Sequence, residues 1–324
     1  MNRCRPLFVL DRWLERFRAL GDATRVELLA ALQGDELSVG ELAEVVEAAQ
    51  PGVSRHLQAL SKAGLVVARR QGTTTYYRLS ADEPVLAGPF GDELRTMARG
   101  RLGQRVERVL TRRRSRSESF FDAAEDWDTL RGELFTDAAG YSSLLPLVRR
   151  GLTVADVGTG TGGMLPFLAQ VGARIVAIDL SAEMLRRARA KARTLGLDDV
   201  TFLRGDLGAL PLESGSVDAA FSALVLHHAP RPLEALREMR RIVRPGGAVV
   251  VVDLMSHGHD WLRDEQADVW LGFGRDEALD LFAQAGLTDR RHQIVSRVDA
   301  RDRKGGGAAP FELFVLSGRV EAAA

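Results

Sequence analysis

Hydrophobic positions follow two different periods along the chain. In residues 17–65, apolar side chains recur three and four positions apart, which predicts amphipathic helices. Beyond residue 150, short apolar runs alternate with helical segments, which indicates a parallel sheet covered by helices on both faces. The pattern therefore predicts an α/β protein with a small helical N-terminal part and a larger sheet-based C-terminal part.

Three helices and a hairpin are predicted in the first eighty residues. Asp22 is placed to cap a helix that ends near Gly34, and a capping box is predicted to begin the second helix at Ser38. The third helix, beginning at Gln50, ends at Gly64, and the strands that follow flank an exposed basic turn. The buried stripe of the third helix comprises Val53, Leu57 and Leu60. This order predicts a helix-turn-helix followed by a β-hairpin wing.

Several segments of this region resemble the ArsR family of winged-helix repressors. The resemblance covers residues 12–80 and rests on the runs 20–25, 53–57, 63–66 and 69–72. It implies a homodimer that binds a double-stranded DNA operator, with the third helix in the major groove and the wing against the phosphates. The metal-sensing members carry a Cys-x-Cys pair where this chain has Ser38-Val39-Gly40, so thiolate metal sensing is not expected.

Donor side chains on the third helix and the wing are the predicted DNA contacts. They lie outside the apolar stripe and suit base edges and phosphates, although a solvated polar face would have the same composition. These residues are Ser54, Arg55, His56, Gln58, Arg69 and Arg70.

Residues 83–118 are predicted to connect two domains, a winged helix over 1–82 and a larger sheet-based domain over 119–324. The basic block at 112–116 has the composition of a solvated surface, with an extended phosphate-binding surface as the alternative. The aromatic-rich run 120–141 resembles the leader helices that precede many methyltransferase domains. As the family's final helix implies, an apolar stripe is expected to pair two copies: Leu94, Met97, Leu102, Val106, Val109 and Leu110.

Five strands are predicted in the C-terminal part, and ligands of such sheets bind at the carboxyl ends of the strands. The predicted strands cover residues 152–157, 174–178, 200–203, 217–222 and 248–252, with helices over 182–195 and 232–243. The first strand runs into the glycine-rich turn Gly158-Thr159-Gly160-Thr161-Gly162, where a ligand can approach the backbone. Taken alone, this turn also fits a dinucleotide-binding loop.

Three further features separate the two interpretations: Asp156 before the glycines, Asp206 after the third strand, and residues 244–247 before the fifth. Together they resemble class I S-adenosylmethionine-dependent methyltransferases over residues 120–320, which implies a Rossmann-like seven-stranded domain. Residues 311–316 would then form an antiparallel edge strand, and residues 261–273 a lid. The resemblance implies that S-adenosylmethionine, or its product S-adenosylhomocysteine, contacts Asp156, Gly158, Thr159, Gly160, Gly162, Asp179, Leu180, Met184, Asp206 and Leu207.

Within that resemblance, Asp156 and the loop receive the methionine part, Asp179 accepts from both ribose hydroxyls, and Asp206 accepts from the adenine amino group. A carboxylate suits a pair of hydroxyls because it accepts two hydrogen bonds at once. An α/β domain that binds a nicotinamide cofactor, or none, is the alternative.

Histidines are the candidates for acid–base chemistry. His227 and His228 follow the fourth strand, so one of them is expected to face the methyl acceptor. A second group comprises His257 and His259 with Asp253 and Asp260; it could hold a metal, but glycine at position 258 argues against this, and no metal is expected. Arsenite methylation is not expected, because that chemistry uses several cysteines and the C-terminal half of this chain has none.

Charge and cysteine content refine this interpretation. The net charge is zero, but residues 1–118 hold 20 basic and 15 acidic side chains, whereas residues 119–324 hold 24 and 29. An excess of basic residues in the first part agrees with a polyanionic partner. The single cysteine, Cys4, excludes an internal disulfide, and neither a signal peptide nor a membrane-length apolar run is predicted, so a cytoplasmic location is expected.

Two functions follow from this organisation. The first is a DNA-binding transcription regulator fused to a methyltransferase that acts on a small molecule. The second is a repressor whose methyltransferase-like domain is a non-catalytic sensor of S-adenosylmethionine or S-adenosylhomocysteine. In the second, the ligand must bind one DNA-binding state more tightly than the other.

Overall fold

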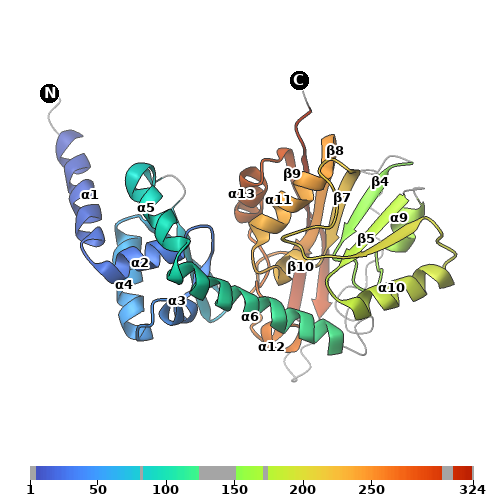
Figure 1. The fold of residues 1–324 in the computed structure, drawn as a ribbon, viewed down its shortest axis with the longest axis horizontal. Coiled ribbons are helices and arrows are strands. Elements are labelled where there is room, and N and C mark those ends of the chain that lie inside the picture. Colours follow the sequence, from blue (N-terminus) through green and yellow to red (C-terminus); the bar gives the residue numbers. More distant parts are fainter. Residues whose placement is uncertain (1–4, 81–82, 124–150, 171–173, 301–308, 323–324) are drawn as a thin grey trace. The chain divides into compact units, whose positions relative to one another are not determined.

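The chain folds into two compact units, residues 1–113 and 114–324, each with its own hydrophobic core. The computed structural model describes residues 5–80, 83–123, 151–170, 174–300 and 309–322. Helix α6 (Arg101–Ala123) begins in the first unit and ends in the second (Figure 1). The expected leader over residues 120–141 lies almost entirely outside the described residues.

The first unit is a helix-turn-helix with a wing, as predicted. The Asp22 side chain accepts from the Arg25 backbone N–H at 3.0 Å, and Ser38 and Glu41 form the predicted capping box. Gly64 follows the third predicted helix with φ +75°, a conformation that favours glycine. The helices of this unit before α6 are α1 (Arg5–Leu20), α2 (Ala23–Ala31), α3 (Val39–Val45), α4 (Gln50–Lys62), a 3-10 turn (Pro84–Leu86) and α5 (Gly88–Ala98).

The wing is the antiparallel pair β2 (Val66–Gln71) and β3 (Thr74–Leu79), in which Gln71 faces Thr74 across the turn. The short strand β1 (Leu37–Ser38) pairs with the other side of β3, so the sheet order is β1-β3-β2. Val66 and Tyr77 are buried against the helices. The wing is therefore anchored to the unit's core by its inner face.

The expected dimer stripe is wrong, because its residues are buried within one chain. Leu94 is fully buried, and Leu102, Val106, Val109 and Leu110 are each at most 8% exposed in the same core as the helix-turn-helix. Met97 packs against this core as well. The apolar faces of α5 and α6 are thus packed against their own domain, so this stripe is not a dimer contact.

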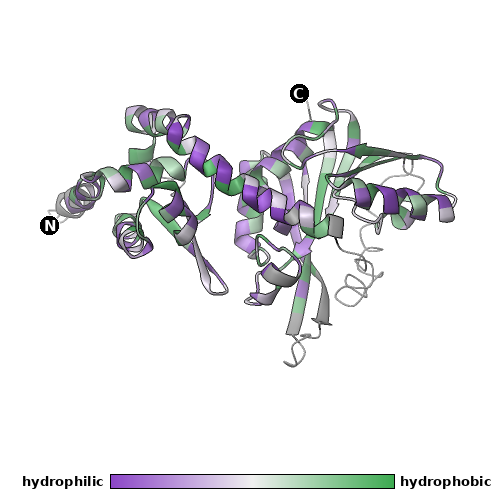
Figure 2. Cartoon of the chain, turned by 60° about the horizontal axis from the view of Figure 1, so that its bottom comes forward, coloured by the Kyte–Doolittle hydropathy of each residue, from purple (hydrophilic) through white to green (hydrophobic). Residues whose placement is uncertain are grey.

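The second unit contains a seven-stranded sheet of order β6-β5-β4-β7-β8-β10-β9, in which the first five strands are parallel. Its strands carry the hydrophobic residues, whereas α10 is largely hydrophilic on its outer surface (Figure 2). The five predicted parallel strands are confirmed, but the fifth begins at Val243 rather than at residue 248, and strand β9 was not predicted. The strands are β4 (Thr153–Val157), β5 (Arg174–Asp179), β6 (Val200–Arg204), β7 (Val217–Ala223), β8 (Val243–Leu254), β9 (Thr288–Ala300) and β10 (Ala309–Arg319).

The last strand is antiparallel, as expected, but it is not at the edge. β10 pairs with β8 on one side and with β9 on the other, so β9 is the edge strand. The burial explains the order: Phe314 and Leu316 of β10 are at most 1% exposed, whereas the first residues of β9 are mostly exposed. A strand as apolar as residues 311–316 belongs inside a sheet.

Helices cover this sheet, as the alternation of strands and helices predicts. α10 packs on β5 and β6, while α11 packs on β7 and β8 and contacts α13. None of the helices in the described ranges is long and apolar enough to cross a membrane. The helices of this unit are α9 (Leu165–Gln170), α10 (Ala182–Thr194), a 3-10 turn (Leu226–His228), α11 (Pro232–Ile242), α12 (Trp261–Glu265) and α13 (Arg275–Gln284).

The segment expected to act as a lid is packed into the unit instead. Trp270, Leu271 and Phe273 are each at most 1% exposed, and the Trp270 indole donates to the Ala229 carbonyl at 2.7 Å. Such large buried side chains hold residues 261–273 as part of the core.

Candidate cofactor and acceptor site

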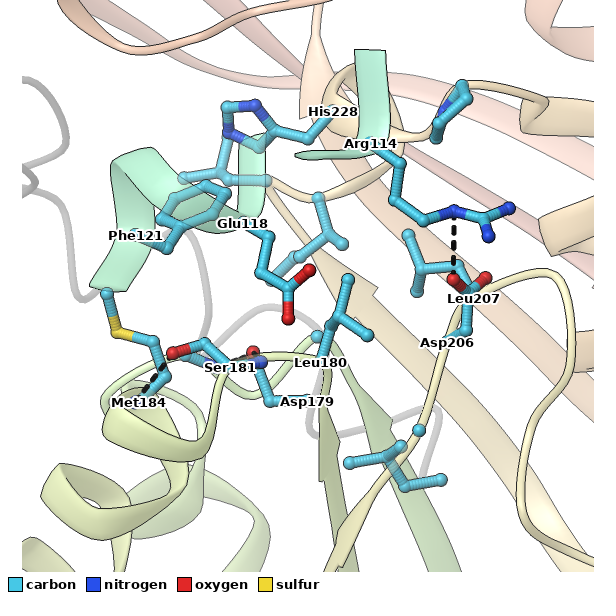
Figure 3. A pocket seen from close by; sticks show the side chains of 18 residues that line it. Arg114, Glu118, Phe121, Asp179, Leu180, Ser181, Met184, Asp206, Leu207 and His228 are labelled. Carbon is cyan, nitrogen blue, oxygen red and sulfur yellow. Dashed lines mark hydrogen bonds and ion pairs between the residues drawn. The ribbon is translucent and has the colours of Figure 1, made fainter. Parts of the chain in front are cut away.

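A pocket of about 850 Å³, counted with its open mouth, lies at the carboxyl ends of β4, β5 and β7 (Figure 3). The pocket is bordered by the loop after β4, the ends of β5 and β6, the start of α10, the loop after β7 and the end of α6. It therefore has the position at which open parallel sheets bind ligands.

The glycine-rich loop after β4 is held from below by strand β5. The Gly158 and Thr159 backbone N–H groups donate to the Ile178 carbonyl at 2.8 and 2.9 Å. Gly158 has φ +74°, and a Cβ there would lie 2.5 Å from the Val225 side chain. Any larger residue would push Val225 or the loop away, so glycine keeps this wall of the pocket in place.

Asp179, at the end of β5, lines the pocket with a fixed carboxylate. Its Oδ2 accepts from the Gly160 N–H at 2.8 Å, and its Oδ1 accepts from the Ser181 N–H at 2.9 Å. These two backbone hydrogen bonds hold the carboxylate at the wall of the pocket.

Asp206 lies across the pocket, in the loop after β6. Its Oδ1 accepts from the Gly208 N–H at 2.8 Å, and its Oδ2 lies 3.1 Å from the Arg114 Nε (Figure 3). The side chain is about one quarter exposed. This carboxylate is therefore placed to accept a hydrogen bond from a ligand at the outer wall of the pocket, next to the Arg114 guanidinium.

Most of the predicted cofactor residues line the pocket, and three do not. The residues lining it are Gly158, Gly160, Asp179, Leu180, Met184, Asp206 and Leu207. Asp156 is 1% exposed and accepts from the Thr159 hydroxyl at 2.6 Å, so these two residues brace the loop from behind. A Cβ on Gly162 would meet Leu165 and Ala188, so this glycine allows the loop to pack against helices.

Sequence reasoning missed Arg114 and Glu118 of α6 as pocket residues, whereas Phe121 lies at the start of the run that resembles methyltransferase leader helices. Arg114, Glu118 and Phe121 line the pocket, and Glu118 also pairs with Arg204 at 3.0 Å. The Phe121 ring meets the His228 ring edge to face, with centroids 4.9 Å apart. Arg114 and Glu118 lie one helical turn apart and so share a helix face, which could have indicated a common role. Arg114 was instead interpreted as part of a solvated basic block.

The two histidines after β7 have different surroundings. His228 lines the pocket, whereas the His227 side chain is 5% exposed and its Nδ1 lies 2.6 Å from the Asp253 Oδ1. The His227 carbonyl accepts from the Val269 and Trp270 N–H groups. His228 therefore borders the pocket, whereas His227 is packed behind it; that one of them faces a methyl acceptor stays a prediction.

Asp268 completes this group and was not predicted. Its Oδ1 lies 3.7 Å from the His227 Nε2 and 3.8 Å from the His228 Nδ1. Burial, with a smaller contribution from Asp253, raises the pKa of Asp268 to about 7 against the lowering effects of His227 and Arg263. Asp268 has no apolar period or motif around it, so only the fold brings it to the histidines.

The second predicted group, at 253–260, does not form as expected. Asp253 turns to His227, whereas the His257 and His259 rings stack on each other with centroids 5.2 Å apart and pack on Phe311. Burial, with smaller contributions from His259, His227 and Arg263, lowers the pKa of His257 to about 3. These two histidines form an aromatic cluster.

The predicted DNA contacts differ in how accessible they are. Arg55 and Gln58 on α4 and Arg70 on the wing are exposed, and Ser54 is half-buried. His56 lies 3.7 Å from the Asp22 carboxylate, and the Arg69 Nε donates to Glu36 at 2.8 Å, so both already have acidic partners.

The basic block is not a free cationic surface. Arg112 pairs with Glu44 at 2.6 Å and Arg113 with Glu41 at 2.5 Å, while the Arg116 side chain donates to the Arg263 carbonyl. With Arg114 on Asp206, each described arginine of this block has a partner.

Comparisons with known proteins agree with both parts of this architecture. Residues 22–67 match the model of the bacterial regulatory protein arsR family, and residues 155–251 match a methyltransferase domain model. A 37.1 kDa protein in a Streptomyces fradiae transposon is 41% identical over 36% of this chain and 35% of that protein. The malonyl-acyl-carrier-protein O-methyltransferase of Pectobacterium atrosepticum is 34% identical over 43% of this chain and 52% of its own length.

The chain thus spans only about a third to a half of the length of these curated relatives. Among solved structures, a chain in the complex of the Haloferax volcanii Trm112 methyltransferase activator with a methyltransferase is similar over 63% of this chain and 98% of that chain, with 25% identity and a TM-score of 0.51. The protein therefore combines an arsR-family helix-turn-helix segment with a methyltransferase domain.

Proposed function

We propose that this protein is a DNA-binding regulator whose second unit transfers a methyl group from S-adenosylmethionine to a small molecule. The observation that carries the proposal is the pair of carboxylates, Asp179 and Asp206, on opposite walls of a pocket floored by the glycine loop. This arrangement suits a ligand with a diol in its middle and an amino-substituted ring at one end.

The residues present fit this cofactor. The Asp179 carboxylate suits the ribose hydroxyls, Asp206 suits the adenine amino group, and Leu180, Met184 and Leu207 supply an apolar surface for the ring. The Gly158 and Gly160 backbone leaves room for the methionine part. When bound, the cofactor supplies an electrophilic methyl group on a sulfonium.

The chain's own contribution to methyl transfer is to position the acceptor and to exclude water. Displacement at a sulfonium methyl needs the nucleophile in line with the breaking bond, so holding both partners in one pocket supplies much of the rate. His228 and Phe121 form the wall on which we place the acceptor. The relative from Pectobacterium atrosepticum is a methyltransferase, which favours transfer over the sensor alternative.

Calorimetric titration of the full chain with S-adenosylmethionine and S-adenosylhomocysteine tests the proposal. Both compounds are expected to bind at one site per chain. Replacing Asp179 by alanine removes two ribose hydrogen bonds to a charged group and is expected to weaken binding about 10- to 100-fold. The exposed Asp198→Asn variant in the loop before β6 serves as the matched control. Absence of heat with either compound would overturn the proposed function.

The first unit is proposed to bind duplex DNA as a dimer, with α4 in the major groove. Exposed Arg55 and Gln58 project from α4 beside its buried stripe, which is where a recognition helix presents its base contacts. An operator, a second copy of the chain and a small-molecule acceptor are therefore the partners we propose.

A further inference from the structure

We infer that His227, His228 and Asp268 form a binding site for one divalent transition-metal ion of the zinc class, at the inner wall of the pocket. The three ligand atoms, two imidazole nitrogens and one carboxylate oxygen, all lie within 4.8 Å of one another, and all three residues are buried. No role in the proposed cofactor contacts accounts for Asp268.

The state of Asp268 is the first argument. Its side chain is 1% exposed, and neither carboxylate oxygen has a hydrogen-bond partner among the residues that the structure describes. A buried carboxylate without a partner costs free energy unless a cation or a proton compensates it. Ala267, immediately before it, has φ +55°, a strained backbone conformation for an alanine.

The orientation of His227 is the second argument. Its Nδ1 contacts the Asp253 carboxylate at 2.6 Å, which places the proton on Nδ1 and leaves a lone pair on Nε2. The His227 Nε2 lies 3.7 Å from the Asp268 Oδ1, which is too long for a direct hydrogen bond between these two atoms. A carboxylate behind a histidine is also the usual outer partner of a metal-bound imidazole.

The distances are the third argument. Metal bonds of about 2.0–2.1 Å separate tetrahedral ligand atoms by about 3.4 Å, which is longer than a hydrogen bond. The two separations from the Asp268 Oδ1, 3.7 and 3.8 Å, are close to this value, and small side-chain rotations would close the remainder. Mixed imidazole and carboxylate ligands favour Zn²⁺, Co²⁺ or Fe²⁺ over Mg²⁺ and Ca²⁺.

Three protein ligands leave one coordination position for water or for an oxygen of a bound molecule. His228 is the member of this group that also lines the pocket, so the proposed ion would lie next to the acceptor side. The proposed ion is separate from the S-adenosylmethionine contacts, since Asp179 and Asp206 lie on other walls (Figure 3).

Titration of the metal-stripped full chain with Co²⁺ tests this site. The protein is prepared without a polyhistidine tag and treated with EDTA, and Co²⁺ is followed by its visible absorption. One equivalent is expected to give the intense bands of a four-coordinate site, and Zn²⁺ is expected to displace it. The Asp268→Asn variant keeps the side-chain shape and is expected to bind about 100-fold more weakly.

The His257→Gln variant is the matched control, because it removes a nearby buried histidine that lies outside the proposed ligand set. It is expected to bind Co²⁺ like the unchanged protein. Circular dichroism and calorimetry with S-adenosylhomocysteine report whether each variant is folded. Binding of that compound without any Co²⁺ bands would overturn the metal site alone, as would bands that survive in Asp268→Asn and disappear in His257→Gln.

Discussion

At the residue scale, the pocket places opposite charges along one helix face. Arg114 sits against Asp206, and one turn later Glu118 lines the same cavity and pairs with Arg204. Both side chains are partly exposed, so each interaction is worth at most about 1 kcal/mol. Their effect on a ligand depends on that ligand's charge.

This charge arrangement predicts opposite effects of two substitutions. Arg114→Ala removes a cation from the pocket and frees a carboxylate oxygen of Asp206, so S-adenosylmethionine should bind about 2- to 5-fold more tightly. Glu118→Gln should weaken its binding by a similar factor. Calorimetry should find smaller changes in affinity for S-adenosylhomocysteine, because its thioether sulfur carries no charge. Equal changes for both compounds would contradict a charge effect.

His257 gives the protein a pH dependence of stability. Its pKa in the folded chain is lowered to about 3 by burial, so between pH 6.5 and 3 the unfolded chain binds the additional proton. The contribution of neutral, buried His257 to the free energy of unfolding should therefore be complete above pH 6.5. It should fall as the pH decreases from 6.5 to 3. Because one pKa unit corresponds to about 1.4 kcal/mol, the loss should exceed about 1 kcal/mol by pH 5.

The His257→Phe variant removes this titration while keeping an aromatic ring against Phe311. Urea unfolding followed by circular dichroism at pH 7 and pH 5 should give a smaller difference for the variant than for the unchanged chain. An identical difference in the two proteins would show that His257 does not carry the effect.

At the scale of elements, α4 and the wing differ as DNA contacts. Arg55 is exposed, so Arg55→Ala should weaken binding to a selected duplex by about 1–3 kcal/mol. Arg69 already donates to Glu36, so Arg69→Ala should cost much less. Fluorescence anisotropy on a duplex selected by the unchanged protein measures both. A larger loss for Arg69→Ala would mean that its ion pair opens on DNA.

Helices and strands were predictable where a local rule acts. The caps at Asp22 and Ser38, the stop at Gly64 and the five parallel strands all follow from side chains close in sequence. That the glycine loop and Asp179 line one pocket was also predictable, because neighbouring parallel strands bring their carboxyl ends together.

What the sequence did not reveal depends on contacts distant along the chain. The partners of Arg114 and Asp268 lie far away in sequence, at Asp206 and at His227. The apolar stripe of α5 and α6 was correctly seen as buried but assigned to a second copy, because periodicity reports that a face is covered and not what covers it.

At the scale of the whole molecule, a dimer must use a surface other than that stripe. On α1, Leu14 is 40% and Phe17 is 60% exposed, and the Trp13 ring stacks on Phe17. An exposed apolar face of this kind is a natural candidate for self-association.

If α1 pairs two copies, Phe17→Glu should shift the chain from dimer to monomer in sedimentation velocity at micromolar concentration. Exposed Glu15→Ala on the same helix is the control and should leave the dimer unchanged. A monomeric unchanged protein would refute the dimer, and a Phe17→Glu protein that stays dimeric would place the interface elsewhere.

The bracing of the glycine loop by Ile178 and Asp179 has a thermodynamic consequence. The loop already has its ligand-binding shape in the structure, so little conformational entropy remains to be lost when a ligand enters. Association should then be a single fast step, with a modest change in heat capacity set by the apolar surface that the ligand covers.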